Sequence, residues 1–192
     1  MNKKITEFQN RKCDRCVNKD TDLCEIHISR IDGHAYCPNL KEKITVFRFM
    51  SKKEFESFRK GKTLVNETRH QGRTNSIGFC FLSIDDYTPE KALHFLSGIA
   101  NFDVCVVFET TKELNKTYGE YASPIKRTGD MRIDLFNLIM GFTDRFTATE
   151  YCTTEYNNKD FKVIKYSENI WQQWQPGEEQ SKLKWIEVKE NE

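Results

Sequence analysis

The chain has 192 residues, enough for one ordinary domain with a small appendage and for a real hydrophobic core. It contains 30 Lys and Arg against 29 Asp and Glu, so no strong overall field draws it to nucleic acid or to an anionic membrane. No apolar run approaches the roughly 20 residues of a membrane span, and the polar start MNKKITEFQN lacks the apolar stretch of a signal peptide. We therefore expect a cytoplasmic protein with no membrane partner, in which clustered cysteines indicate metal rather than disulfides.

Four of the seven cysteines fall in the first 37 residues, with the spacing Cys13-x2-Cys16-x7-Cys24-x12-Cys37. The first pair has the spacing with which two thiolates grip one ion, and the later two can complete a tetrahedron. The residues between them favour turns, and so short a segment cannot bury enough surface to fold alone. The pattern predicts a structural zinc site in a small module, residues 1–43, whose folding energy comes from the metal.

Other interpretations of the cysteines stay open at this point. His27 or His34 could replace one thiolate, or the four cysteines could be unlinked buried residues. An iron–sulfur cluster also uses four cysteines, but the wider gaps here differ from those of the common ferredoxin runs. The remaining Cys80, Cys105 and Cys152 lie singly within apolar runs and are interpreted as small core residues.

The chain after Lys41 changes to regular elements. The run ITVFRFM, residues 44–50, predicts a strand, and Ser51 with Glu54 has the capping-box spacing that begins a helix ending near Gly61. Residues 66–75 are polar and rich in turn formers, and Ser76 opens the apolar run SIGFCFLS.

The second half of the chain continues the mixture of helices and strands. Thr88 and Pro89 begin a predicted helix, DVCVVFE (103–109) predicts a buried strand, and residues 110–130 read as a long polar connection. Further elements are expected in five places: an amphipathic stretch at 131–142, strands near 146–152 and 161–166, a short helix near 168–174 and a strand near 183–188. The predicted class is α+β, because strands and helices do not alternate regularly.

Three segments, in this order, resemble ADP-ribosyltransferase domains. TVFRFMSKKEFESFRKGKTL (45–64) is similar to the first strand and helix of such domains, which carry an Arg and an x-E-F pattern. TNSIGFCF (74–81) resembles the second element, in which a Ser begins an apolar strand, and TATEYCTTEYNNKDFKVIKY (147–166) resembles the third, a Glu in a late strand pair. The resemblance implies that residues 44–192 form a mixed or antiparallel split sheet of this type.

The resemblance also implies roles for individual residues. Arg48 would contact the phosphates or ribose of NAD, Ser76 would hold the nicotinamide end and orient the acid, and Glu150 would be the catalytic carboxylate, with Glu155 as its rival. The family often has Glu or Gln two residues before that carboxylate, whereas this chain has Ala148. The implied function is NAD-dependent ADP-ribosyl transfer to a macromolecular acceptor, or NAD glycohydrolysis, without an indication that arginine is the acceptor.

The alternation of side chains along a strand predicts the neighbours of Arg48 and Glu150. Arg48 shares a strand face with Val46, and Glu150 shares one with Ala148 and Cys152, so each charge needs a polar partner. A guanidinium suits a pyrophosphate, and a carboxylate stabilises the positive charge that develops as nicotinamide leaves. The alternative is that Arg48 and Glu150 form only a structural ion pair.

A basic stretch lies between the first two resembling segments. It could contact NAD phosphates, through Arg73 in particular, or nucleic acid, or it could be a solvated surface. Its members are Arg59, Lys60, Lys62, Arg69 and Arg73.

The competing function is a non-catalytic, zinc-containing protein that binds nucleic acid or a host defence complex. Small proteins of both kinds are common in phages and other mobile elements. Side chains of Arg48, Ser76 and Glu150 that converge on one pocket would favour the enzyme, and scattered side chains would favour the binding protein.

Overall fold

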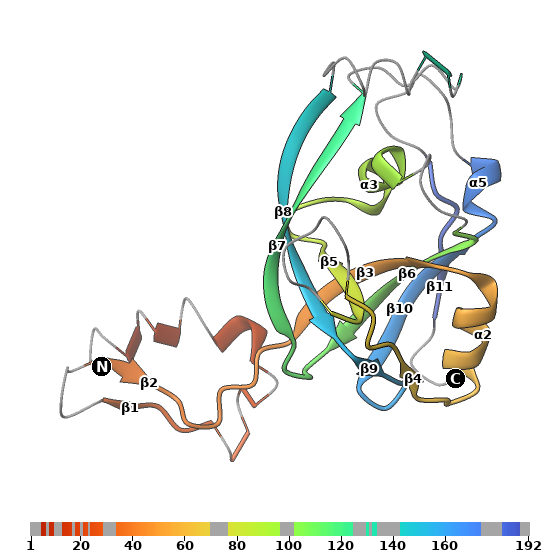
Figure 1. Cartoon of the computed structure of the whole chain (residues 1–192). Helices are drawn as coiled ribbons and strands as arrows, with labels where there is room; N and C mark the ends of the chain where they lie inside the picture. Colours follow the sequence, from red (N-terminus) through yellow and green to blue (C-terminus); the bar gives the residue numbers. More distant parts are fainter. Residues whose placement is uncertain are drawn as a thin grey trace. The chain divides into compact units, whose positions relative to one another are not determined.

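A computed structural model gives the structure of this chain. It describes residues 5–6, 8–9, 13–16, 18–19, 21–22, 24–28, 34–69, 77–96, 102–124, 130, 132–133, 143–173 and 182–188, with the backbone alone at 94–96, 119–124 and 143–146. The chain divides into two compact units, Met1–Ile44 and Thr45–Glu192. The α+β class is confirmed, because the strands are mostly antiparallel and the helices are few (Figure 1).

The described residues of the small unit form short helical pieces, turns and one short hairpin. Residues 5–6 and 8–9 are helical, a 3-10 helix, η1 (Cys13–Arg15), follows, and strands β1 (His27–Ile28) and β2 (Ala35–Tyr36) pair antiparallel. An isolated antiparallel bridge joins Cys16 to Glu42. Among the described residues of this unit, few backbone hydrogen bonds belong to regular elements, as expected of a segment that needs a further stabilising ligand.

A seven-stranded sheet forms the large unit, with the strand order β11-β10-β6-β3-β5-β8-β7. Each pairing in it whose register is described is antiparallel. The strands are β3 (Ile44–Met50), β5 (Phe79–Ser83), β6 (Val104–Thr110), β7 (Asn115–Pro124), β8 (Thr143–Thr153), β10 (Phe161–Glu168) and β11 (Ile186–Glu187). A separate two-stranded ladder pairs β4 (Leu64–Val65) with β9 (Glu155–Tyr156).

Three helices of the large unit are described: α2 (Lys52–Arg59), α3 (Pro89–Leu96) and α5 (Ile170–Gln173). The predicted cap of α2 is confirmed, because the Ser51 side chain accepts a hydrogen bond of 3.2 Å from the backbone N–H of Glu54. None of the helices in the described part of the chain is long and apolar enough to cross a membrane.

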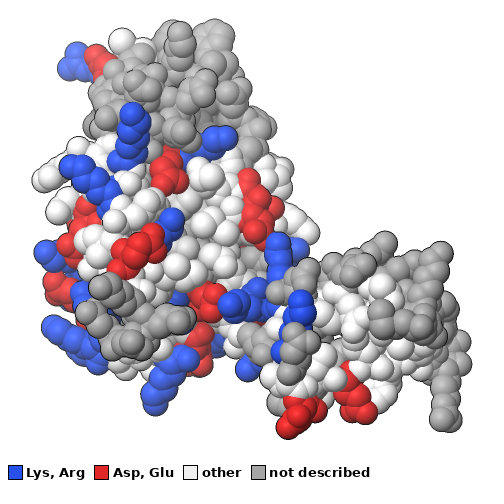
Figure 2. Space-filling view, turned by 180° about the vertical axis from the view of Figure 1, so that it is seen from behind, with Lys and Arg blue, Asp and Glu red and all other residues white. Residues whose placement is uncertain are grey.

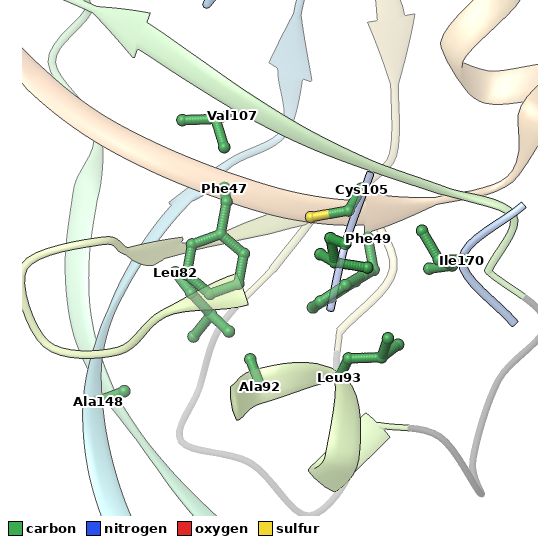
Figure 3. Close-up of a cluster of buried hydrophobic side chains, with 10 residues drawn as sticks. Phe47, Phe49, Leu82, Ala92, Leu93, Cys105, Val107, Ala148 and Ile170 are labelled. Atoms are coloured by element: carbon green, nitrogen blue, oxygen red, sulfur yellow. The ribbon is translucent and has the colours of Figure 1, made fainter. Parts of the chain in front are cut away.

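The two faces of the sheet carry different cores. Paired residues in an antiparallel sheet share a face, and Phe47 pairs with Leu82, so both point to the side that α3 covers. Figure 3 shows Ala92 and Leu93 of α3 pointing toward these sheet side chains. We call this side the α3 face.

The opposite side packs against α2 and is the α2 face. It is dominated by aromatic rings: Phe58 of α2 lies 5.3 Å from Phe108 and 5.5 Å from Tyr156 between ring centroids, and Phe81 lies 4.9 Å from Phe161. Such pairs contribute contact energy beyond the apolar area that they bury.

Gly78 fixes how β5 enters the sheet. Its φ is +91°, and a Cβ atom at this position would lie 2.3 Å from the carbonyl oxygen of Thr153. The backbone of β5 can therefore approach the end of β8 only with glycine here.

One sequence expectation was wrong and another lies outside the described residues. Residues 115–124, expected within a polar connection, form β7, which pairs with β8 over its whole length. An edge strand needs hydrogen bonds more than burial, so its sequence carries little apolar signal. Of the amphipathic stretch expected at 131–142, the structure describes only residues 132 and 133, which are helical.

Candidate functional site

The topology of the small unit brings its four cysteines toward one another. Cys13 and Cys16 lie on one turn, closed by a 3.0 Å hydrogen bond from the N–H of Cys16 to the carbonyl of Cys13. The β1–β2 hairpin carries Cys24 and Cys37 at its open end, since Cys24 precedes β1 and Cys37 follows β2. The bridge to Glu42 then returns the chain to Cys16.

The pKa of Cys13 also responds to the three other cysteines of the small unit. Burial raises the pKa of Cys13, which is 6% exposed, and the neighbouring thiols of Cys24, Cys16 and Cys37 raise it further. All four are free cysteines. A set of four cysteine thiols matches the donor set of structural zinc.

The sulfurs of this module are more open than those of a closed zinc centre. In the described part of the chain, the donor atoms that lie mutually within 4.8 Å belong to three residues of the large unit instead, Cys80, Glu150 and Cys152. Tetrahedral Zn–S bonds of about 2.3 Å place the sulfurs roughly 3.8 Å apart. Metal binding would therefore draw the four thiols of the small unit closer together. The imidazole of His27, an alternative ligand, lies 3.4 Å from the carboxylate of Glu25.

Arg48 is held in a polar network on the α2 face. Its Nε donates to Glu54 Oε1 at 2.9 Å and its Nη1 donates to the carbonyl of Cys80 at 3.0 Å. The hydroxyl of Tyr156 donates to the same Glu54 oxygen at 2.8 Å. The guanidinium carbon also lies 5.1 Å from the ring centroid of Phe79, within cation–π range.

Burial and charge act against each other in this network. Burial opposes the charge of Arg48, but the Glu54 carboxylate more than offsets it and raises the pKa of Arg48. Burial also raises the pKa of Tyr156, which keeps its hydroxyl protonated as a donor. The Arg48 and Glu54 side chains are only 17% and 19% exposed, so the pair is a largely buried structural ion pair.

Glu150 lies in β8 with no exposed surface. The hydroxyl of Thr117 is 3.5 Å from Glu150 Oε2, and the sulfurs of Cys80 and Cys152 are 3.0 Å apart beside it. The hydrogen bond with Cys80 and then burial raise the pKa of Cys152. A carboxylate and two thiols thus lie side by side on one face of the sheet.

The registers place Arg48 and Glu150 on opposite faces of the sheet. Phe47 pairs with Leu82 and Leu82 pairs with Glu150, so Glu150 shares the α3 face with Phe47. Arg48 follows Phe47 in the strand and points to the α2 face, where it meets Glu54. The two charges do not line one pocket, and the ion pair expected between them is replaced by Arg48 with Glu54.

The other residues of the expected site are dispersed or lie outside the described part. Ser76 and Arg73 fall outside it. Glu155, the rival carboxylate, lies in β9 with its side chain 58% exposed, and its Oε1 is 3.7 Å from Lys112 Nζ.

The described members of the basic stretch, Arg59, Lys60, Lys62 and Arg69, are exposed, and Arg59 lines a hollow of the large unit. The hollow has a volume of about 400 Å³ and lies between α2, β10 and β11. The guanidinium carbon of Arg59 lies 5.8 Å from the Phe55 ring centroid and 5.9 Å from that of Tyr166. The residues that line the hollow include Phe55, Arg59, Asn158, Lys162, Tyr166 and Ile186.

Charges of both signs mix on the surface. Lys and Arg side chains are interspersed with Asp and Glu side chains on the face of the large unit shown in Figure 2. A polyanion would therefore be held by a local group of cations rather than by a broad field.

Comparisons with profiles of known protein families, with curated proteins and with solved structures find no match for this chain.

Sequence reasoning missed the juxtaposition of Cys80 and Cys152. Each lies alone in its apolar run, and they meet only because β5 and β8 pair across more than 70 residues of chain. The sequence held one signal of this cluster: Cys152 lies two residues from Glu150 and therefore shares its strand face.

Replacing one thiolate of the small unit tests the zinc assignment. Cys37→Ser is expected to lose one equivalent of zinc relative to the native chain and to unfold residues 13–43, because the metal supplies their folding energy. Elemental analysis of the purified protein and limited proteolysis measure the two effects. Cys105→Ala, which changes a buried cysteine outside both clusters, should keep the zinc. Full zinc retention by Cys37→Ser, or iron with visible absorbance in the native chain, would refute the assignment.

Proposed function

We propose that this chain is a non-catalytic, zinc-containing protein that binds single-stranded nucleic acid at the hollow between α2 and β10. The observation that carries the proposal is the meeting of cationic and aromatic side chains there, with Arg59 against the rings of Phe55 and Tyr166 and beside Lys162. Grooves for single strands combine these two elements, cations for the backbone and rings for the bases. Of the two rings, the half-buried Tyr166 would meet a base, because Phe55 is only 2% exposed.

The size of the hollow favours a single strand over a duplex. A volume of about 400 Å³ suits one small ligand group, such as a base turned out of its stack. Bases inside a duplex cannot enter such a hollow, whereas an unstacked strand presents them freely. Asn158 in the lining offers both a donor and an acceptor to a base edge.

Phosphate contacts would come from exposed cations of the lining and of the chain next to it. Arg59 and Lys162 line the hollow, and Lys60 and Lys62 follow Arg59 just after the end of α2. The net charge of +1 makes a small set of contacts more reasonable than a long wrapped strand. The opposite faces of Arg48 and Glu150 also support a binding protein over the transferase, since these two of the three expected catalytic side chains do not converge.

Neutralising two cations of the hollow tests this function. With a fluorescent single strand of about 12 nucleotides, Arg59→Gln with Lys162→Gln should weaken binding on the order of 10-fold, and the slope of log K against log salt should fall by about 1.4. Fluorescence anisotropy across a salt series measures both. Lys53→Gln with Lys91→Gln removes the same two charges from exposed positions of α2 and α3 outside the hollow and should change little. A native chain that does not bind, or an equal loss in the control double variant, contradicts the proposal.

A second candidate is NAD-dependent ADP-ribosyl transfer to a macromolecular acceptor. It is supported by the sheet order, because β3, β5 and β8, which carry the resembling segments, are neighbours. In this candidate the Glu150 carboxylate stabilises the positive charge at the anomeric carbon as nicotinamide leaves. Arg48 would keep its structural place on the α2 face, and Glu150 would have to become accessible from its buried position.

The effect of Glu150→Gln on NAD turnover distinguishes the transferase from the nucleic-acid-binding protein. Glu150→Gln keeps the size of the side chain but removes its charge, so turnover of labelled NAD should fall by a factor on the order of 100 to 1,000 if Glu150 is catalytic. Nicotinamide release and labelled macromolecule are the readouts. Glu155→Gln serves as the matched control and should leave turnover unchanged. A native chain that neither binds nor cleaves NAD would remove this candidate.

A further inference from the structure

Cys80, Glu150 and Cys152 form a compact set of metal-binding groups on the α3 face. Their donor atoms all lie within 4.8 Å of one another. The sheet register accounts for this: Cys80 pairs directly with Cys152 across β5 and β8, and Glu150 is two residues from Cys152 on the same face. Three donors on two adjacent strands are thus brought together by the backbone itself. The two sulfurs, 3.0 Å apart, would separate to roughly 3.8 Å around a tetrahedral ion.

We propose that these three side chains bind a zinc ion, at a site separate from the four cysteines of the small unit. Two thiolates and one carboxylate oxygen are ligands that zinc accepts in tetrahedral sites. Three protein ligands leave a fourth position for water, and the partly exposed Cys80 marks the side from which an ion enters.

Thr117 supports the site from the next strand. It pairs with Glu150 across β7 and β8, and its hydroxyl lies 3.5 Å from Glu150 Oε2. A hydroxyl in this place orients the carboxylate that binds the ion, as the outer partners of metal ligands commonly do.

Zinc binding leaves the net charge of the cluster unchanged. Binding converts the two thiols to thiolates and releases two protons to solvent, while the ion offsets two of the three negative charges, so the cluster carries one negative charge with or without the ion. Because Glu150 has no exposed surface and Cys152 is 2% exposed, binding thus adds no net charge to a place that water does not reach. The bound ion would clip β5 to β8 near the middle of the sheet.

The site is independent of nucleic-acid binding at α2, and it would leave Glu150 unavailable as a transferase carboxylate. Loss of the metal and loss of NAD turnover are separate readouts, so either idea can fail without the other.

Cobalt titration of the reduced, metal-free full chain tests the proposal without any substitution. Cobalt bound by thiolates gives charge-transfer absorption that scales with the number of Co–S bonds. We expect two equivalents to bind, one with about half the charge-transfer intensity of the other, in the ratio of two thiolates to four. A single equivalent with the intensity of four thiolates, or two of equal intensity, would overturn the second site.

Substitutions then assign the second equivalent. Cys80→Ser with Cys152→Ser should lose only the weaker absorption. Glu150→Gln should weaken that equivalent by at least the roughly 10-fold to 100-fold that loss of an outer partner of a ligand costs, because Glu150 is itself a ligand. Cys105→Ala should retain both equivalents. If the double variant keeps the second equivalent, or if Cys80 and Cys152 are joined by a disulfide in protein purified under reductant, the proposal fails.

Discussion

The antiparallel register of β3, β5 and β8 decides which side chains can meet at the centre of this molecule. Each pair across these strands shares a face, and each step along a strand changes the face. Leu82 pairs with both Phe47 and Glu150, which places Glu150 with the apolar side chains under α3. Arg48 is one step from Phe47 and therefore points to the other face. A slip of one residue in either pairing would exchange these neighbours.

Each face satisfies its buried polar groups in its own way. On the α2 face the cation Arg48 lies among aromatic rings, and the carboxylate of Glu54 and the hydroxyl of Tyr156 complete its network. Removing one partner of such a buried pair typically costs about 3–5 kcal/mol, so the network has a structural role of its own. On the α3 face the polar groups are two thiols and the carboxylate of Glu150, a set suited to a cation from outside the chain.

Local features of the fold could be predicted from the sequence. The strand at 44–50 and the capped helix after Ser51 depend on neighbouring residues, and both are confirmed. Alternation also gave the correct companions within a strand, such as Cys152 beside Glu150. It could not give the face of one strand relative to another, because that depends on register between segments far apart in the chain. The partner of Arg48 could nevertheless have been predicted from the sequence. Glu54 is only six residues away and lies in the first turn of α2, the helix that covers this face.

Double-mutant cycles on the free energy of unfolding test the opposite-face arrangement most directly. Urea denaturation of Arg48→Met, Glu54→Gln, Glu150→Gln and the two double variants with Arg48→Met gives two coupling energies. The structure predicts a coupling on the order of 2 kcal/mol between Arg48 and Glu54, which are 2.9 Å apart, and less than about 0.5 kcal/mol between Arg48 and Glu150. A coupling between Arg48 and Glu150 as large as that with Glu54 would mean that the two charges meet, and would contradict the arrangement.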